Sequence, residues 1–190
     1  PCYNEQERFI NSIEHFLNYL KKQKYQWEII LVNDGSKDKT LTLIKQKAIT
    51  NPNLKIVSYN NNQGKGYAIA KGVENAKGEI ILFSDLDHAV PIQTIETFFK
   101  YFEKKIPMVI GSRRVKGATC GFKAFNNKTA KKIFKKITIF DWAFDAELLY
   151  LCKIYKVNYI QAPVVWTDVK GSKVSVIRDV FKSLFGLLKI

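Results

Sequence analysis

The sequence predicts an α/β fold in which a mostly parallel sheet is covered by helices on both faces. Short apolar runs rich in β-branched residues alternate along the chain with segments whose apolar residues recur at helical spacing. The runs are apolar throughout, which is typical of strands buried on both faces of a parallel sheet. Polar clusters follow directly after several of these runs, and parallel sheets bind their ligands beyond the carboxyl ends of the strands.

The first half of the chain carries the most regular pattern. Apolar residues at helical spacing predict an amphipathic helix over residues 5–22. Pro91 is suited to open a helix at its first turn. The expected strands here are Trp27–Val32, Leu54–Tyr59, Glu79–Phe83 and Met108–Gly111, and the helices between them begin near Thr40, Gly66 and Pro91.

The second half is less regular, and we expect the whole of residues 1–190 to form a single domain. A Gly-rich connection covers residues 111–121. Expected helices lie near residues 128–137 and 144–155, expected strands near residues 159–160 and 164–166, and an amphipathic terminal helix near residues 175–190. No stretch reaches the roughly 18 apolar residues of a membrane span.

The chain of 190 residues is strongly basic, with 31 Lys and Arg against 17 acidic residues and a formal charge of +14. Such a charge favours anionic partners, namely nucleic acid, an acidic membrane surface or phosphorylated substrates, and a well-solvated basic surface is the alternative. No helix-turn-helix, zinc-finger or RNP motif supports a nucleic-acid-binding module, so this non-enzyme alternative is the weakest. The scattered cysteines favour reduced thiols in a cytosolic compartment.

Asp85-Leu86-Asp87 is the first candidate site. Two carboxylates two residues apart, at the end of an apolar strand, are able to reach one point beyond the sheet. Hard oxygen ligands that leave room for water and substrate phosphates suit Mg²⁺ or Mn²⁺. A solvated turn is the alternative interpretation of this triplet.

Two further clusters occupy similar positions after strands. Asp34 follows a buried strand and precedes Gly35, where an acid accepts hydrogen bonds from a nucleoside or simply caps a turn. Residues 62–66, Asn-Gln-Gly-Lys-Gly, lie between a strand and a helix, and a helix N-terminus with Lys65 favours an anion. This segment matches neither the Walker motif nor the dinucleotide-binding glycine pattern.

Together these motifs resemble glycosyltransferase family 2. The chain is most similar to its branch of dolichyl-phosphate β-glucosyltransferases and other polyprenyl-phosphate glycosyltransferases, with dolichyl-phosphate mannose synthases as close relatives. The resemblance covers nearly the whole chain. It is carried by Pro1-Cys2-Tyr3-Asn4-Glu5, Val32-Asn33-Asp34-Gly35-Ser36, Asn62-Gln63-Gly64-Lys65-Gly66, Asp85-Leu86-Asp87, Gly111-Ser112-Arg113, Cys120-Gly121-Phe122-Lys123, Trp142-Ala143-Phe144-Asp145-Ala146-Glu147-Leu148 and Gly171-Ser172-Lys173-Val174.

The resemblance implies a GT-A fold, in which a Rossmann-like, nucleotide-sugar-binding half over about residues 1–111 joins an acceptor half over about 112–172, followed by an amphipathic helix over 173–190. It implies that Asp85 and Asp87 hold Mg²⁺ or Mn²⁺, and that Asp145 and Glu147 are the acidic pair of the acceptor half. The implied catalytic residues are Asp87, Arg113, Lys123 and Asp145, with Arg113 and Lys123 facing phosphates. The implied nucleotide- and substrate-binding residues are Pro1, Tyr3, Asn4, Glu5, Asp34, Gly64, Lys65, Asp85 and Leu86.

The implied reaction is the inverting transfer of glucose from UDP-glucose to dolichyl or polyprenyl phosphate. A mannose synthase that uses GDP-mannose, or a family 2 enzyme that acts on a sugar hydroxyl, is the alternative. A lipid phosphate oxygen is already ionised near pH 7, so orientation and charge stabilisation matter more than a strong base. Asp145 is therefore only a candidate base or orienting group.

We expect a membrane-associated enzyme whose catalytic domain faces the cytosol, at the endoplasmic reticulum of a eukaryote or the plasma membrane of a prokaryote. The apolar stripe of the terminal segment, flanked by Lys and Arg, is suited to lie among anionic lipid headgroups. Packing of the same stripe on the protein is the alternative.

Overall fold

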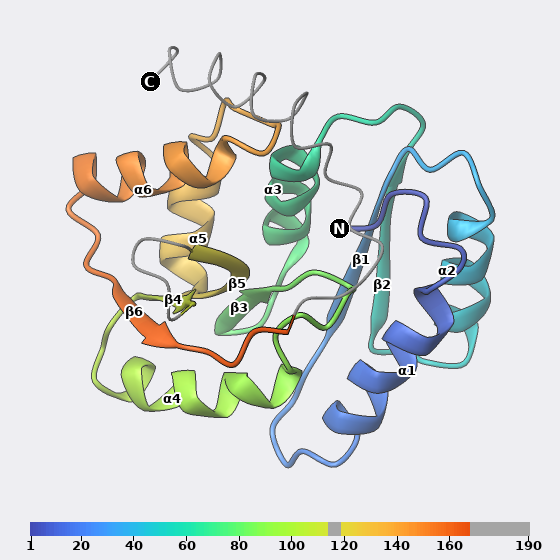
Figure 1. Ribbon diagram of the computed structural model, residues 1–190, viewed down its shortest axis with the longest axis horizontal. Coiled ribbons are helices and arrows are strands. Elements are labelled where there is room, and N and C mark those ends of the chain that lie inside the picture. The colour runs from blue at the N-terminus through green and yellow to red at the C-terminus, as the bar shows by residue number, and fades with distance from the viewer. Residues whose placement is uncertain (114–118, 168–190) are drawn as a thin grey trace.

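A computed structural model of the chain describes residues 1–113 and 119–167 (Figure 1). The described strands form two sheets with helices packed on both faces of each, which confirms the α/β class. In chain order the elements are α1 (Phe9–Leu20), β1 (Ile29–Asp34), α2 (Thr40–Ile49), β2 (Leu54–Tyr59), α3 (Lys65–Asn75), β3 (Ile80–Phe83), a 3₁₀ turn (Ile92–Thr94), α4 (Ile95–Glu103), β4 (Met108–Ser112), β5 (Thr119–Asn126), α5 (Asn127–Phe134), α6 (Phe144–Ile154) and β6 (Ile160–Pro163).

The first sheet pairs β1 with β2 in parallel, in a register that runs from Ile29 opposite Leu54 to Asp34 opposite Tyr59. Helices α1 and α2 cover one face, and α3 packs on the other (Figure 1). Cys2 lies along the opposite edge of β1 as an isolated parallel bridge. Its N–H donates to the carbonyl of Val32 at 2.7 Å, and its carbonyl accepts from the N–H of Asp34 at 2.9 Å.

The second sheet is mixed, with strand order β3-β5-β4-β6. Strand β5 is antiparallel to both of its neighbours, whereas β4 and β6 are parallel. Helix α4 covers one face, and α5 and α6 lie on the other (Figure 1). The expectation of mostly parallel strands therefore holds for the β1–β2 and β4–β6 pairs. It fails for β5, which lies inside the second sheet and is antiparallel to both of its neighbours.

Two expectations for the second half are wrong. Residues 119–126 form β5, although the expected Gly-rich connection ran to residue 121 and no strand was expected after it. The apolar pattern of this strand was hard to recognise because Gly121 and Lys123 interrupt it. Lys123 is nevertheless fully buried in the structure. Residues 164–166 were expected to be a strand, but β6 ends at Pro163.

The first helix begins at Phe9 rather than at residue 5, because the residues before it are bound to the turn after β1. Asn4 has a positive φ of 52° and donates its N–H to Ser36 Oγ at 3.0 Å. Glu5 donates its N–H to Thr40 Oγ1 at 2.7 Å. The predicted terminal helix over 173–190 lies outside the described residues, and none of the helices within 1–113 and 119–167 is long and apolar enough to cross a membrane.

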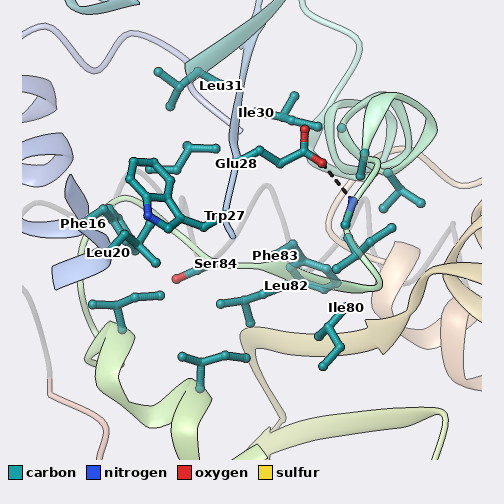
Figure 2. A pocket seen from close by; sticks show the side chains of 18 of the residues that line it. Phe16, Leu20, Trp27, Glu28, Ile30, Leu31, Ile80, Leu82, Phe83 and Ser84 are labelled. Atoms are coloured by element: carbon teal, nitrogen blue, oxygen red, sulfur yellow. Dashed lines mark hydrogen bonds between the residues drawn. The ribbon is translucent and has the colours of Figure 1, made fainter. Parts of the chain in front are cut away.

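A cavity of about 710 Å³ lies between β1 and β3 (Figure 2). Near the start of both strands, Glu28 accepts hydrogen bonds from the N–H groups of Lys77 and Gly78 at 2.6 and 3.0 Å. The carboxyl end of β1 and the loop after β3 contact the N-terminus of α3. Apolar side chains of β1, β3 and the surrounding helices line the cavity.

Candidate active site

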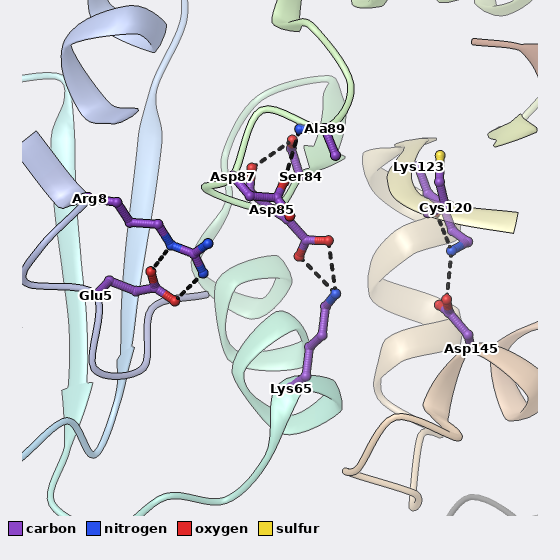
Figure 3. A network of polar contacts seen from close by, with 10 residues as sticks. All are labelled: Glu5, Arg8, Lys65, Ser84, Asp85, Asp87, Ala89, Cys120, Lys123 and Asp145. Carbon is purple, nitrogen blue, oxygen red and sulfur yellow. Dashed lines mark hydrogen bonds and ion pairs between the residues drawn. The ribbon is translucent and has the colours of Figure 1, made fainter. Parts of the chain in front are cut away.

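The carboxyl end of β1 and the loop after β3 meet the first turn of α3, and several of the sequence-predicted residues lie there (Figure 3). Asp34, the last residue of β1, is only 3% exposed. Its carboxylate accepts hydrogen bonds from Asn62 Nδ2 at 2.9 Å and from the N–H groups of Gln63 at 2.7 Å and Gly64 at 3.1 Å. Asp34 thus fixes the loop before α3. A nucleoside bound to Asp34 would share its carboxylate with the hydrogen-bond donors of this loop.

The N-terminal motif lies beside this loop. Tyr3 is 41% exposed, and Asn4 accepts a hydrogen bond from the N–H of Lys37 at 2.8 Å. Glu5 is buried and forms an ion pair with Arg8, whose Nη2 lies 2.8 Å from Glu5 Oε1. Pro1, half-buried, lines the cavity beside β1.

Arg8 is a candidate that the sequence interpretation missed. The hydrogen bond to Glu5 is the main cause of the raised pKa of its guanidinium, and the nearby charges of Asp85 and Asp87 add to it. The side chain therefore places a permanent positive charge beside the acidic motif (Figure 3). Its position three residues after Glu5, before the first helical turn, is the only sequence signal for this role.

The three residues of the acidic motif have different surroundings. Asp85 follows β3, and both of its carboxylate oxygens lie close to Lys65 Nζ, Oδ1 at 2.8 Å and Oδ2 at 3.0 Å. Asp87 Oδ1 accepts from the N–H of Ala89 at 3.0 Å, so the two carboxylates have different partners (Figure 3). Leu86 is buried in the cluster that contains Phe9, where it anchors the loop.

The glycines of residues 62–66 are required by another part of the protein. Gly64 has φ +100°, and a Cβ added there would lie 2.4 Å from the carbonyl oxygen of Phe140. A Cβ on Gly66 would lie 2.7 Å from the Cβ of Phe144, and the Gly66 N–H donates to the Phe140 carbonyl at 2.8 Å. The two glycines thus allow the segment before α6 to pack closely on the helix N-terminus that was expected to favour an anion.

That segment, residues 138–143, is held by Glu147 of α6. Glu147 is 6% exposed, and its carboxylate accepts from Thr138 N–H, Thr138 Oγ1 and Ile139 N–H, at 2.7 to 3.1 Å. The carboxylate is thus committed to the loop. Trp142, in the same segment, places its ring 4.7 Å from Lys65 Nζ.

Lys123 and Asp145 form a pair on the side of the acceptor half (Figure 3). Lys123 has 0% exposure, and its Nζ donates to the Cys120 carbonyl and to Asp145 Oδ2, each at 2.8 Å. Asp145 Oδ1 is buried and has no hydrogen-bond partner among the described residues. The ammonium of Lys123 was expected to face a phosphate. It is instead buried and forms an ion pair with Asp145.

Arg113 directly follows β4 and is the last residue of the first described range, 1–113. Its guanidinium carbon lies 3.9 Å from the ring centroid of Trp166, and stacking of this kind holds the planar group in one orientation. Its Nε is buried without a partner in residues 1–113 and 119–167.

The donor set fits Mg²⁺ or Mn²⁺. Asp85 and Asp87 supply hard carboxylate oxygens from one loop, and no cluster of three or more His, Cys, Asp or Glu that could hold a metal occurs in the described part of the chain. Two carboxylates leave the remaining positions to water and substrate phosphates, which is the usual arrangement for Mg²⁺.

The profile of the family described as "Glycosyl transferase family 2" matches residues 1–160. The chain belongs to glycosyltransferase family 2. The family 2 match takes in the clusters around Asp34, Lys65, Asp85, Lys123 and Asp145, so one family accounts for the residues that the fold brings to this edge.

Curated relatives agree with this assignment. A dolichyl-phosphate beta-glucosyltransferase of Trichomonas vaginalis is 30% identical over 229 residues, which cover 100% of this chain and 71% of that protein. The human dolichyl-phosphate beta-glucosyltransferase is 29% identical over 218 residues, which cover 91% of this chain and 67% of that protein.

Solved structures confirm the GT-A-like α/β fold of this family 2 chain. The mannosyltransferase PcManGT from Pyrobaculum calidifontis, in complex with GDP-Man and Mn²⁺, has a TM-score of 0.72 at 16% identity and covers all of this chain. S. aureus TarS 1-349 in complex with UDP-GlcNAc has a TM-score of 0.63 at 19% identity and covers 93% of it. The matches span 63% and 59% of those two chains, so this chain corresponds to less than two thirds of each.

Proposed function

We propose that this chain catalyses the inverting transfer of glucose from UDP-glucose to a dolichyl or polyprenyl phosphate. The names of the curated relatives support the sugar and the acceptor. The observation that carries the proposal is the gathering of Lys65, Asp85 and Asp87 at the N-terminus of α3, with the Lys123–Asp145 pair on the neighbouring strand and helix (Figure 3).

The donor side has to stabilise a leaving diphosphate. Asp85 and Asp87 would hold Mg²⁺ or Mn²⁺, which when bound offsets the negative charge that develops on the leaving group. Lys65 and Arg8 add positive charge at the same place. Asp34 and the segment from Tyr3 to Glu5 lie where the nucleoside would bind, because they line the loops beyond the carboxyl end of β1.

The acceptor side has to bind and orient a phosphate that is already a nucleophile. Arg113, oriented by Trp166, is the group best suited to bind the acceptor phosphate. Lys123 holds Oδ2 of Asp145 in place, and the Asp145 side chain, which is 31% exposed, is our candidate to orient the acceptor. No strong base is needed, since the attacking oxygen carries its own charge near pH 7.

The decisive experiment measures transfer from a panel of sugar nucleotides to a short polyprenyl phosphate, with Mg²⁺ and with chelator. We expect UDP-glucose to be the best donor and the chelator to abolish transfer. Faster transfer from GDP-mannose would favour the mannose alternative, which the fold likeness to PcManGT keeps in view. Transfer to a sugar hydroxyl with none to the lipid phosphate would refute the acceptor.

We infer that the reaction takes place at the cytosolic surface of a membrane, that of the endoplasmic reticulum in a eukaryote. A polyprenyl phosphate keeps its phosphate at the headgroup level, so the active site has to come to the bilayer. The basic, amphipathic sequence of residues 173–190 is our candidate for the contact. Sedimentation with anionic liposomes, before and after truncation at Ser172, tests this, and equal binding of the two forms would exclude the segment as the anchor.

A further inference from the structure

The carboxylate of Asp85 is confined by two residues. Lys65, the first residue of α3, places its ammonium 2.8 Å from Oδ1 and 3.0 Å from Oδ2 (Figure 3). Gly121 of β5 is also close, since a Cβ added there would be 2.2 Å from Asp85 Oδ2 and 3.0 Å from its Cγ. Any side chain larger than hydrogen at position 121 would therefore push the carboxylate away from this position.

The ammonium of Lys65 is confined as well. Its Nζ lies 4.7 Å from the centroid of the Trp142 ring, which is within the range of a cation–π contact. The turn that carries Trp142 is fixed by Asp141, whose Oδ1 accepts from the N–H of Ala143 at 2.8 Å. The lysine side chain is 15% exposed, so its charge is largely shielded from water.

A divalent metal and the ammonium compete for the same oxygens. Both oxygens of Asp85 are within 3.0 Å of Nζ, so a metal bound to Asp85 would bring a second cation into contact with the first. Repulsion between like charges at such distances disfavours this double occupancy. One of the two cations therefore has to leave Asp85 when the other binds.

We propose that Lys65 is a built-in counter-cation of Asp85 that a divalent metal displaces, with Gly121 and Trp142 as the positioning residues of this exchange. The idea rests on the proposed function, since it assigns the metal to Asp85. The displaced ammonium stays at the N-terminus of α3, where an anionic diphosphate is favoured. The pair thus neutralises Asp85 in the free protein and makes a lysine available when metal and donor arrive together.

The test measures Mn²⁺ binding to the full chain without nucleotide, by the paramagnetic resonance signal of free Mn²⁺. We expect Lys65→Met to bind Mn²⁺ more tightly than the wild type, by roughly fivefold or more, because the competing cation is gone. With UDP present, the same variant should lose affinity for the nucleotide. Lys71→Met is the matched control, since Lys71 lies on the same helix and pairs with Glu74 on the surface.

The positioning residues give a second measurement. Gly121→Ala should weaken Mn²⁺ binding, whereas Gly72→Ala, whose Cβ would lie 3.3 Å from Val32 Cγ2, should leave it unchanged. Trp142→Leu should strengthen nucleotide-free Mn²⁺ binding, and Trp142→Phe should restore the wild-type value by restoring an aromatic face. A purely structural role for Trp142 would not show this rescue.

The outcomes separate this inference from the proposed function. Equal Mn²⁺ affinity of wild type and Lys65→Met, with metal-dependent transfer intact, would overturn the exchange alone. Tighter Mn²⁺ binding by Lys65→Met in a protein that transfers no sugar to lipid phosphate would support the exchange and overturn the function. Failure of every form to bind Mn²⁺, with and without UDP, would overturn the metal role and the exchange together.

Discussion

The two acidic residues of α6 differ in what surrounds their carboxylates. Glu147 is buried and accepts hydrogen bonds from Thr138 and Ile139, whereas Asp145 has a buried oxygen without a partner in the described part of the chain. We expect Glu147→Gln to lower the free energy of unfolding by about 1–3 kcal/mol, because the charged acceptor and one of its oxygens are lost. Asp145→Asn should instead lower the rate of transfer. Urea unfolding and initial rates on both variants test this, and the reverse pattern would exchange the two roles.

Asp87 is the clearest test of the metal assignment. Its Oδ1 accepts the N–H of Ala89 within its own loop, so Asp87→Asn preserves size and keeps this contact. Removal of one anionic ligand should lower the rate of transfer by roughly tenfold or more and raise the Mn²⁺ concentration required for half-maximal rate. A variant with the normal rate and metal dependence would show that Asp87 is not a ligand.

His88 should make the free energy of unfolding depend on pH, in a direction set by the surroundings of its imidazole. Burial, and next the charge of His15, lower the pKa of His88 from its ordinary value of 6.5. As pH falls below about 6.5 the unfolded chain binds a proton that the folded chain does not, so the free energy of unfolding decreases. His88→Asn suits the positive φ of 58° at this position and should reduce this dependence. Urea unfolding at several values of pH between 5 and 8 measures it, and identical slopes would refute the expectation.

For individual residues, the sequence predicted where the acidic side chains lie but not the contacts that give them their roles. Asp34 and Asp85 were found because each follows an apolar strand, which is a local signal. Arg8 and Gly121 carry no comparable signal, because each acts on the acidic motif only after distant segments have folded against it. Lys123 was expected to face a phosphate, and its burial against Asp145 is equally a product of tertiary structure.

Helix α3 illustrates how one element is constrained by another. A Cβ on Gly66 would lie 2.7 Å from the Cβ of Phe144 and 2.8 Å from the Ile139 carbonyl, whereas one on Gly72 meets only Val32 Cγ2 at 3.3 Å. Gly66→Ala should therefore displace the segment before α6 and cost about 1–3 kcal/mol of the free energy of unfolding. Gly72→Ala should leave the free energy of unfolding nearly unchanged, because the higher helix propensity of Ala offsets the tight contact of the new Cβ with Val32. Equal effects of the two substitutions in urea unfolding would contradict this contact.

The strands of the first half were predictable because each is a short apolar run, several of which a polar cluster follows, and the helices because their apolar residues recur at helical spacing. Strand β2 was predicted with the bounds that it has, and the predicted starts of α2 and α3 are correct to within one residue. Strand β5 was missed because its pattern is set by burial on both faces of a mixed sheet, including a buried lysine.

The arrangement of the whole molecule was predictable only as a class. Alternating elements indicated an α/β protein, and the resemblance to family 2 indicated the GT-A fold, but neither indicates that β5 lies between β3 and β4. Strand order depends on which edges become available as the chain folds, and such non-local pairings leave no periodic signal in the sequence.

The cavity between β1 and β3 has a consequence for the behaviour of the protein in solution. Ile29 donates its N–H toward β2, at the Asn53 carbonyl, whereas Val32 accepts from Cys2 on the other edge. Because successive residues of a strand point their backbone groups to opposite sides, the amide of Ile30 faces the cavity and that of Leu31 faces β2. No strand among the described residues pairs with this part of β1, so the amide of Ile30 lacks the ladder hydrogen bond that protects the amide of Leu31. Hydrogen exchange tests this at single amides: Ile30 should exchange faster than Leu31, and equal protection of the two amides would show that this edge is closed.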